Sequence, residues 1–432
     1  MNAQRKYPPA PEEMTFEPKV LVVGGGASGI LSAEKAAELG LSVVLIEKTE
    51  ELGGKAAQLS FLYQSNLSPS QWLKDKISSL EKNNKVTIHT NSQLEKVNGQ
   101  VGNFKVTLNI EGKKEEMDIG AIIMATGMDL SSKMPAQVEK GAGSFLSQME
   151  FEKQFTQLAS GDSKTFVLVV KEDDFLIGCI NALKYSKKLK EANHNVYVFF
   201  DEMKVSEEGT EKLYHQVREE GVTFIRGTNN LKIGQEEEKF TLTTIDPQLP
   251  VKLAKELVIN FDYYIFNEDL LPGADTGKLA EILRVNLGPG GFFQEDNYHT
   301  EPVYSNRQGI YFVGACRMPD LLHNIQEQAG AAVNSIYQLS VADVKELMEK
   351  TPLIDVIKCA YCLTCYRSCP WNAIDLLYEI EGAAWDGAPY LHPLACQKCG
   401  CCVAECPNRA ISFPGYTDED MQKEFKEIGG KV

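Results

Sequence analysis

The residues with the clearest chemical potential are cysteines, which are concentrated toward the C-terminal end of the sequence. The chain has 432 residues and eleven cysteines. Eight of them form two runs with the same spacing, C-x2-C-x2-C-x3-C-P: Cys359, Cys362, Cys365 and Cys369, then Cys396, Cys399, Cys402 and Cys406. Each run is followed by x-x-Ala-Ile, so this segment is an internal repeat. With no apolar export signal in the sequence, this usage indicates metal binding in a reducing compartment, not disulfides.

The spacing of the repeat predicts two iron–sulfur clusters. Three closely spaced cysteines can wrap one cubane, while the fourth, stiffened by its proline, crosses to the other cluster, as in two-cluster ferredoxins. A zinc ribbon or a disulfide framework would need paired cysteines instead of this duplicated run. Cys401 and Cys316 are the remaining cysteines of the region, and we interpret both as bystanders. We therefore assign Cys359, Cys362, Cys365 and Cys406 to one [4Fe-4S] cluster and Cys396, Cys399, Cys402 and Cys369 to the other.

A second chemical signal lies near the N-terminus, where a glycine-rich turn follows an apolar run. Gly24, Gly26 and Gly29 have GxGxxG spacing after a strand predicted over 20–23, and a helix is expected over 28–39. The glycines allow a tight turn, close approach of backbone to a pyrophosphate, and close packing of helix on strand. A second predicted strand over 43–46 ends at Glu47, which can accept hydrogen bonds from a ribose. This combination predicts a dinucleotide site.

Three further segments extend this signal. The pair Gly53-Gly54, taken by itself, is most simply a turn. An apolar strand over 121–124 leads into Ala125-Thr126-Gly127, whose small residues allow backbone to pass close to a neighbour. Late in the chain, a strand leads to Gly314-Ala315-Cys316, and a helix is expected over 324–339. The N-terminus of this helix would favour an anionic ring. His323 lies just before it, and a polar residue near a helix cap is as good an interpretation as a proton-transfer role.

The middle of the chain has the strand and helix pattern of a second nucleotide-binding domain, but without the glycine-rich loop that binds phosphates. A strand is predicted over 165–170, but no GxGxxG follows it, and the next residues include Asp173 and Asp174. Carboxylates there would repel a pyrophosphate. Helices over 180–191 and 211–220 and strands over 196–200 and 222–225 complete a Rossmann-like pattern, which we expect not to bind NAD(P)H. Cys179 is interpreted as a structural cysteine, with an activated thiol as the alternative.

Composition excludes several classes of function. The 44 basic and 60 acidic residues give a net charge of -16, which argues against nucleic acid and anionic membranes as main partners. An apolar content of 43% supports sizeable cores. No apolar run is long enough to span a bilayer, and we expect a polar, proline-rich lead-in at the N-terminus instead of a signal peptide.

Together these motifs resemble known flavoproteins. The N-terminal fingerprint, the acid after the second strand, the glycine pair and the later Ala-Thr-Gly resemble the FAD half of the thioredoxin and glutathione reductase type. In that family the late strand ends in Gly-Asp, and here Ala315 stands at the aspartate position. The whole chain from about 19 to 414 resembles the A subunit of heterodisulfide reductase and the flavoprotein subunits of the quinone-interacting membrane-bound oxidoreductase. The segments that carry this resemblance are 53–59, 218–227, 309–316 and the cysteine repeat.

The resemblance implies a set of cofactor-binding residues. Pyrophosphate contacts would come from the glycine turn, the ribose contact from Glu47, and contacts to the isoalloxazine or its phosphates from the segment after Gly53. No cysteine follows Gly54 up to about Trp72, where full-length relatives carry further ligands, so the chain resembles a compact form. The implied FAD-binding residues are Gly24, Gly26, Ala27, Ser28, Gly29, Glu47, Lys48, Gly54, Lys55, Leu94, Ala125, Gly127, Gly314 and Ala315.

The expected fold is α/β. Two Rossmann-like dinucleotide-binding domains, the second degenerate, precede an α+β two-cluster ferredoxin domain. The expected boundaries are 1–18 for the lead-in, 19–160 and 273–350 for a discontinuous FAD-binding domain, 161–272 for the inserted domain without a nucleotide loop, and 351–432 for the ferredoxin domain.

The expected function is that of an oxidoreductase component that moves electrons between FAD and two [4Fe-4S] clusters. No catalytic base or nucleophile stands at a recognisable spacing, so catalytic residues are not assigned. The resemblance implies other redox subunits of a heterodisulfide reductase-like complex as partners, with homodimerisation in that complex and electron bifurcation left open. We expect a cytoplasmic location, with membrane association only through partners. Two alternatives stay open: an autonomous NAD(P)H:acceptor reductase, and an assembly module whose flavin site is vestigial.

Overall fold

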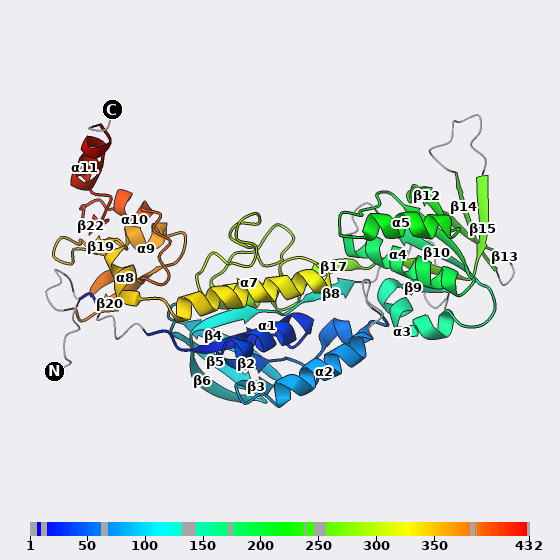
Figure 1. The fold of residues 1–432 in the computed structure, drawn as a ribbon, viewed down its shortest axis with the longest axis horizontal. Coiled ribbons are helices and arrows are strands. Elements are labelled where there is room, and N and C mark those ends of the chain that lie inside the picture. The colour runs from blue at the N-terminus through cyan, green and yellow to red at the C-terminus, as the bar shows by residue number, and fades with distance from the viewer. Residues whose placement is uncertain are drawn as a thin grey trace.

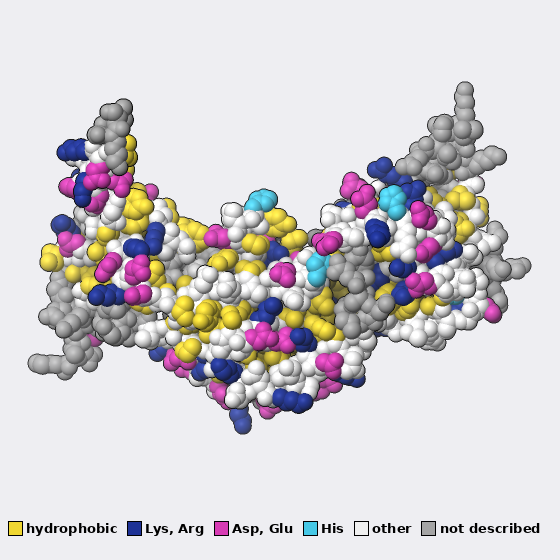
Figure 2. Space-filling model, in the orientation of Figure 1, with side chains coloured by type: hydrophobic (Ala, Val, Ile, Leu, Met, Phe, Trp, Pro, Cys, Tyr) yellow, Lys and Arg dark blue, Asp and Glu magenta, His cyan; other side chains and the backbone are white. Residues whose placement is uncertain are grey.

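The chain folds into three lobes arranged in a row (Figure 1). The computed structural model describes residues 7–9, 15–61, 68–131, 144–171, 176–236, 239–245, 256–380, 385 and 387–429. A central lobe lies between a lobe built from the middle of the sequence and a smaller C-terminal lobe. Within the described residues, no helix combines the length and apolar character needed to cross a membrane. On the face seen in Figure 2, Lys and Arg side chains are interspersed with Asp and Glu.

The central lobe is organised around a five-stranded sheet in which every neighbouring pair is parallel. The near-continuous apolar runs form these strands because both faces of the sheet are covered. In spatial order the strands are β18 (Ile310–Phe312), β7 (Ala121–Met124), β1 (Lys19–Val23), β2 (Ser42–Ile46) and β3 (Val86–His89). One strand from late in the chain thus completes a sheet begun at the N-terminus, as the discontinuous arrangement required.

Helices α1 (Ala27–Glu38) and α7 (Leu322–Ser340) pack together over one face of this sheet. Small buried side chains such as Ala33, Ala36 and Ala332 lie in their shared core, which lets the two helices approach closely. The remaining elements of the lobe are η2 (Gly54–Gln58), α2 (Pro69–Glu81), α6 (Thr276–Leu283), η3 (Gly314–Cys316), and an antiparallel sheet of β4 (Ser92–Asn98), β5 (Phe104–Ile110) and β6 (Lys113–Ile119). Both sheets contribute to one hydrophobic core.

The second lobe also has a parallel five-stranded sheet. Its spatial order is β12 (Thr223–Arg226), β11 (Asn195–Phe200), β10 (Thr165–Val170), β16 (Tyr263–Phe266) and β9 (Phe145–Ser147). Its helices are α3 (Gln148–Leu158), α4 (Leu176–Glu191) and α5 (Thr210–Glu219), and an antiparallel sheet of β13 (Lys232–Glu236), β14 (Lys239–Ile245) and β15 (Glu256–Phe261) lies beside them. Asp173 and Asp174 lie outside the described residues.

The strand pairing of the second lobe begins before residue 160, the expected end of the first part of the FAD-binding domain. β9 pairs with β16 and α3 packs on β9, so both belong to the second lobe. The sequence between 144 and 160 carries no composition change that would have placed it there. The chain passes between the two lobes through β8 (Met128–Ser131) and β17 (Asp269–Pro272), which pair as an antiparallel ribbon.

The C-terminal lobe holds the cysteine repeat. Its elements are α8 (Val344–Glu349), β19 (Leu353–Ile354), α9 (Thr364–Ser368), β20 (Ile374–Tyr378), β21 (Gly387–Leu391), α10 (Cys401–Ala404), β22 (Ile411–Ser412) and α11 (Asp418–Gly429). Gln100 of the central lobe donates hydrogen bonds to Asn372 O (2.9 Å) and to the Asp375 carboxylate (3.0 Å), which fastens this lobe to its neighbour.

The N-terminal segment packs against two lobes. The Tyr7 hydroxyl donates a hydrogen bond to Pro389 O (3.0 Å), and its ring meets that of Tyr390 edge-on. Phe16 packs against the core of the central lobe. The expected polar lead-in therefore contains two aromatic anchors, which its Pro-rich composition did not indicate.

Candidate cofactor sites

The glycine turn after β1 lies so close to neighbouring backbone that two of its glycines, Gly24 and Gly29, leave no room for a side chain. An alanine Cβ at Gly29 would lie 1.8 Å from Gly24 O, and one at Gly24 would lie 2.4 Å from Ala125 O. Gly24 also has a positive φ of 110°. Gly26 differs from both, because a Cβ there meets nothing within 4 Å and its φ of -75° suits any residue. The open space above Gly26, beside the unpaired amides at the start of α1, fits an approaching phosphate group.

The pair Gly53-Gly54 is part of this turn region. Gly53 forms a bridge with Gly26 and donates from its amide to Gly25 O (2.8 Å), and a Cβ at Gly54 would lie 3.3 Å from Gly26 Cα. The pair is therefore more than a plain turn, because its two glycines pack against Gly26, which is distant in sequence. The next residue, Lys55, donates from Nζ to Met128 O (2.5 Å) and lies 3.4 Å from Asp129 Oδ1.

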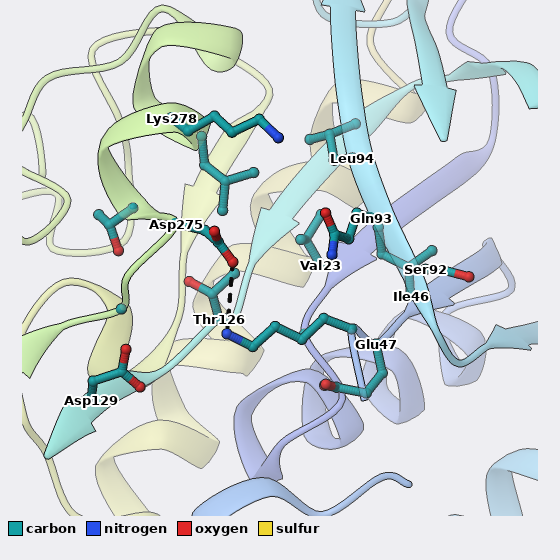
Figure 3. Close-up of a pocket in the computed structure, with 15 residues that line it drawn as sticks. Val23, Ile46, Glu47, Ser92, Gln93, Leu94, Thr126, Asp129, Asp275 and Lys278 are labelled. Atoms are coloured by element: carbon teal, nitrogen blue, oxygen red, sulfur yellow. Dashed lines mark ion pairs between the residues drawn. The ribbon is translucent and has the colours of Figure 1, made fainter. Parts of the chain in front are cut away.

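A cavity opens at the carboxyl ends of β1, β2 and β7, the edge at which such sheets bind ligands (Figure 3). It encloses about 710 Å³ of empty space that is open to solvent. Of the residues selected from the sequence, it is lined by Gly24, Glu47, Lys48 and Leu94. The Glu47 carboxylate accepts hydrogen bonds from Gly25 N (2.6 Å) and Thr49 N (2.9 Å), so it is fixed at the cavity wall.

Other residues of this cavity were missed by sequence reasoning. Thr126 lies between the two selected residues Ala125 and Gly127, and its Oγ1 is buried with no hydrogen-bond partner among the described residues. A buried hydroxyl of this kind calls for a polar ligand. Further lining residues come from the chain around α6: Gly273, Asp275, Thr276, Lys278 and Leu279. The dashed line in Figure 3 marks the ion pair between Lys48 Nζ and Asp275 Oδ2 (3.7 Å).

Asp129 is the other acidic residue of the cavity. Its partial burial raises its pKa, but a hydrogen bond from Ala274 N (2.9 Å) and the charge of Lys55 outweigh that effect, so the pKa lies below its ordinary value. Asp129 therefore carries a negative charge that Lys55 balances.

The late glycine motif meets the N-terminal one. A Cβ at Gly314 would lie 2.0 Å from Ser28 Oγ, and the Gly314 amide donates to the Gln328 side chain of α7 (2.8 Å). Ala315 follows in η3, and Cys316 donates to Met124 O (3.1 Å) from a fully buried position. Burial raises the pKa of the Cys316 thiol to about 12, as expected of a structural cysteine. Gln328 was not selected from the sequence.

Two cavities in the C-terminal lobe divide the eight cysteines into the expected sets. One is lined by Cys359, Cys362, Cys365 and Cys406. The other is lined by Cys369, Cys396, Cys399 and Cys402, together with Cys401. Within the described part of the chain, no three metal-binding side chains converge on the position of a single ion. Four cysteines that line one cavity without converging on a single point suit a multi-iron cubane better than one ion.

The two halves of the cysteine repeat share the same hydrogen bonds from main-chain amides to cysteine sulfur atoms. Main-chain amides donate to Cys359 Sγ (3.4 Å) and, at the equivalent position, to Cys396 Sγ (3.4 Å). They also donate to Cys369 Sγ and Cys406 Sγ, both at 3.3 Å. Such bonds stabilise the negative charge of cluster ligands and tune reduction potentials. Burial raises the pKa of Cys402 to about 12, so its thiolate needs a compensating positive charge, which a bound iron–sulfur cluster would supply.

His392, at the end of β21, gives this lobe a pH dependence. Burial lowers its pKa from 6.5 to about 4, although the Asp375 charge opposes the shift. Because the unfolded chain binds an extra proton between these values, folding stability is lost as pH falls from 6.5 toward 4. We expect this residue to lower the free energy of unfolding by about 2 kcal/mol at pH 5 relative to neutral pH.

Urea denaturation of wild type and His392→Gln at pH 7 and pH 5 measures this effect. The difference between the two proteins isolates the histidine from the acid lability of other groups. An equal loss of stability in both proteins would show that His392 is not buried in its neutral form.

Comparison with known proteins identifies both parts of the chain. Residues 18–335 match the model of the pyridine nucleotide-disulphide oxidoreductase family. The chain belongs to this family. Residues 358–421 match the 4Fe-4S dicluster domain. An oxidoreductase domain of the FAD type and an iron–sulfur domain therefore lie on one polypeptide, and the chain is an oxidoreductase.

Relatives and solved structures agree with this membership. The chain is 24% identical to the iron–sulfur A subunit of CoB–CoM heterodisulfide reductase from Methanocaldococcus jannaschii, over 82% of this chain and 69% of that protein. It is 23% identical to the A subunit of the H(2)/formate:CoB-CoM heterodisulfide,ferredoxin reductase from Methanococcus maripaludis, with the same coverage. Thioredoxin reductase from Lactococcus lactis shares the fold, at 17% identity and a TM-score of 0.51 over 75% of this chain and 99% of that one. The resemblance expected from the motifs is confirmed.

Proposed function

We propose that this chain is an electron-transfer subunit that holds one FAD and two [4Fe-4S] clusters and exchanges electrons with other redox subunits. The observation that carries the proposal is that two separate cysteine-lined cavities lie on the same chain as a glycine turn with open space above Gly26. The bound flavin supplies exchange of electrons in pairs or singly, and each cluster carries one electron.

The chain's own residues would act by binding and orientation. The amides at the start of α1 would meet the pyrophosphate, and Glu47 would accept hydrogen bonds from the ribose. Lys55, whose Nζ lies 3.4 Å from Asp129 Oδ1, would contact the isoalloxazine or the phosphates of the cofactor. The N-terminus of α7 would favour negative charge near it.

The partners belong to the proposal. The relatives are named as A subunits of heterodisulfide reductases, which supports a complex with other redox subunits, in which a second copy of this chain would have a place. The Methanococcus maripaludis protein is named for two acceptors, a heterodisulfide and ferredoxin. We propose as an extension that this chain takes part in electron bifurcation, in which the two electrons of a pair pass to two different acceptors.

An autonomous NAD(P)H:acceptor reductase is the second candidate, because the family match spans the second lobe as well. Against it, the sequence between β10 and α4 contains no GxGxxG fingerprint. We expect anaerobic mixing of the purified chain with excess NADH or NADPH to leave the flavin absorbance unchanged over minutes, while dithionite bleaches it. Bleaching by a pyridine nucleotide within seconds would favour the second candidate.

A further inference from the structure

The second cysteine cavity contains one more thiol than a cubane needs. Cys401 lines it together with the four expected ligands, whereas the first cavity is lined by four cysteines only. Cys401 follows Cys399 by two residues and immediately precedes Cys402, and it lines the cavity beside these two expected ligands. It therefore lies among the ligands, and describing it as a bystander does not account for this position.

The repeat shows where the two halves of the lobe differ. The backbone turns match, because Tyr361 and Lys398 share a positive φ (50° and 57°), as do Leu363 and Gly400 (59° and 75°). Cys401 occupies the position of Thr364 in the first half. There, Cys362 Sγ lies 3.4 Å from Thr364 Oγ1. At the equivalent position of the second half, a hydroxyl that can only hydrogen-bond to a ligand is replaced by a thiol that can itself bind iron.

We propose that Cys401 is a reserve iron ligand of the second cluster, able to replace Cys399 at the same iron. This inference rests on the proposed function, since it requires that the second cavity holds a [4Fe-4S] cluster. Cys399 and Cys401 are both exposed, unlike the buried Cys402, so an exchange between them displaces no packed side chain.

The exchange balances without an external oxidant or reductant. The bond between iron and Cys399 Sγ breaks and a bond between iron and Cys401 Sγ forms. The proton that Cys401 loses on binding would pass to the released Cys399 thiolate. The iron–sulfur core keeps its charge and its number of thiolate ligands.

Alanine variants test the reserve ligand, because alanine cannot ligate. The comparison uses Cys399→Ala, Cys401→Ala, the double variant Cys399→Ala/Cys401→Ala, and Cys362→Ala as the matched variant in the first repeat. All are purified anaerobically as full chains, and iron per chain and EPR spectra of the reduced clusters are measured. We expect Cys399→Ala and Cys401→Ala to keep about eight iron atoms and both cluster signals, with the second signal shifted in Cys399→Ala.

The double variant and Cys362→Ala are expected to lose one cluster signal and to fall below eight iron atoms. The proposal is overturned if Cys399→Ala loses that signal as completely as the double variant. If wild type itself lacks two cluster signals, the proposed function fails instead, so the two failures are distinguishable.

A gain-of-ligand variant settles the case in which Cys399→Ala does not fold, as judged by its circular dichroism. Cys362→Ala/Thr364→Cys places a reserve thiol in the first repeat, where the backbone has the same turns. We expect it to recover the signal that Cys362→Ala loses. Absence of recovery would contradict the geometric basis of the proposal.

Discussion

Replacing Gly26 by alanine is expected to weaken FAD binding by at least about 100-fold, or about 2.7 kcal/mol, while leaving the apoprotein as stable as wild type. A Cβ at this position meets nothing within 4 Å in the chain itself and suits the observed backbone conformation. The space it would fill is the one through which backbone approaches a pyrophosphate. Retention of FAD during gel filtration, together with thermal unfolding of the apoprotein, measures both quantities.

Two other glycines serve as controls for this variant. Gly277→Ala adds a Cβ that also meets nothing within 4 Å, on α6 of the same lobe, and should keep both FAD and stability. Gly29→Ala places its Cβ 1.8 Å from Gly24 O and should damage the fold itself. Unchanged FAD affinity in Gly26→Ala would contradict the assignment of the glycine turn as a pyrophosphate site.

Replacing Lys184 by methionine is expected to destabilise the second lobe by about 3 to 5 kcal/mol. Lys184 Nζ of α4 lies 3.1 Å from a carboxylate oxygen of Glu152 in α3, and both side chains are almost fully buried (5% and 1% exposed). The variant leaves a buried carboxylate without its counter-charge. Lys184 also donates to Phe61 O (3.1 Å), and Glu152 accepts from Ser60 N (2.7 Å), so the pair also holds a segment of the central lobe against the second lobe.

Urea denaturation and hydrogen exchange of the α3 and α4 amides measure the effect. Lys188→Met is the matched control, because Lys188 pairs with Glu191 on the exposed side of the same helix and should change stability by at most about 1 kcal/mol. The double variant Lys184→Met/Glu152→Leu should recover much of the loss, since it removes both charges. A loss below about 1 kcal/mol in Lys184→Met would mean that water reaches the pair.

Local patterns in the sequence predicted most of the fold. The cysteine repeat, the helices α1, α4, α5 and α7, and the parallel strands β1, β2, β7, β10, β11 and β12 follow from apolar runs and spacing, and α7, expected over 324–339, forms Leu322–Ser340. The family resemblance implied that a late segment returns to the FAD-binding domain, and the pairing of β18 with β7 is how it does so. The placement of β9 and α3 could not be predicted, because their partners are distant in sequence and no local signal marks the change of lobe.

The same distinction applies to the sites. Each selected glycine had a local signature, and so did each cysteine of the two runs. Thr126 was passed over because its burial without a partner is a property of the folded chain. The residues around α6 carry no motif, and they reach the cavity only through the return of the chain along β17. Cys401 was recognised as extra, but its place in the wall of the second cavity is a property of the folded chain.

The central claim is that one flavin and two iron–sulfur cubanes share this polypeptide and exchange electrons. An anaerobic titration of the purified chain with dithionite, followed by absorbance and EPR, tests it most directly. We predict uptake of about four electrons per chain, two by the flavin and one by each cluster, with about eight iron atoms present. Uptake of only about two electrons, a single cluster signal, or intact clusters without flavin after reconstitution with FAD would contradict the account.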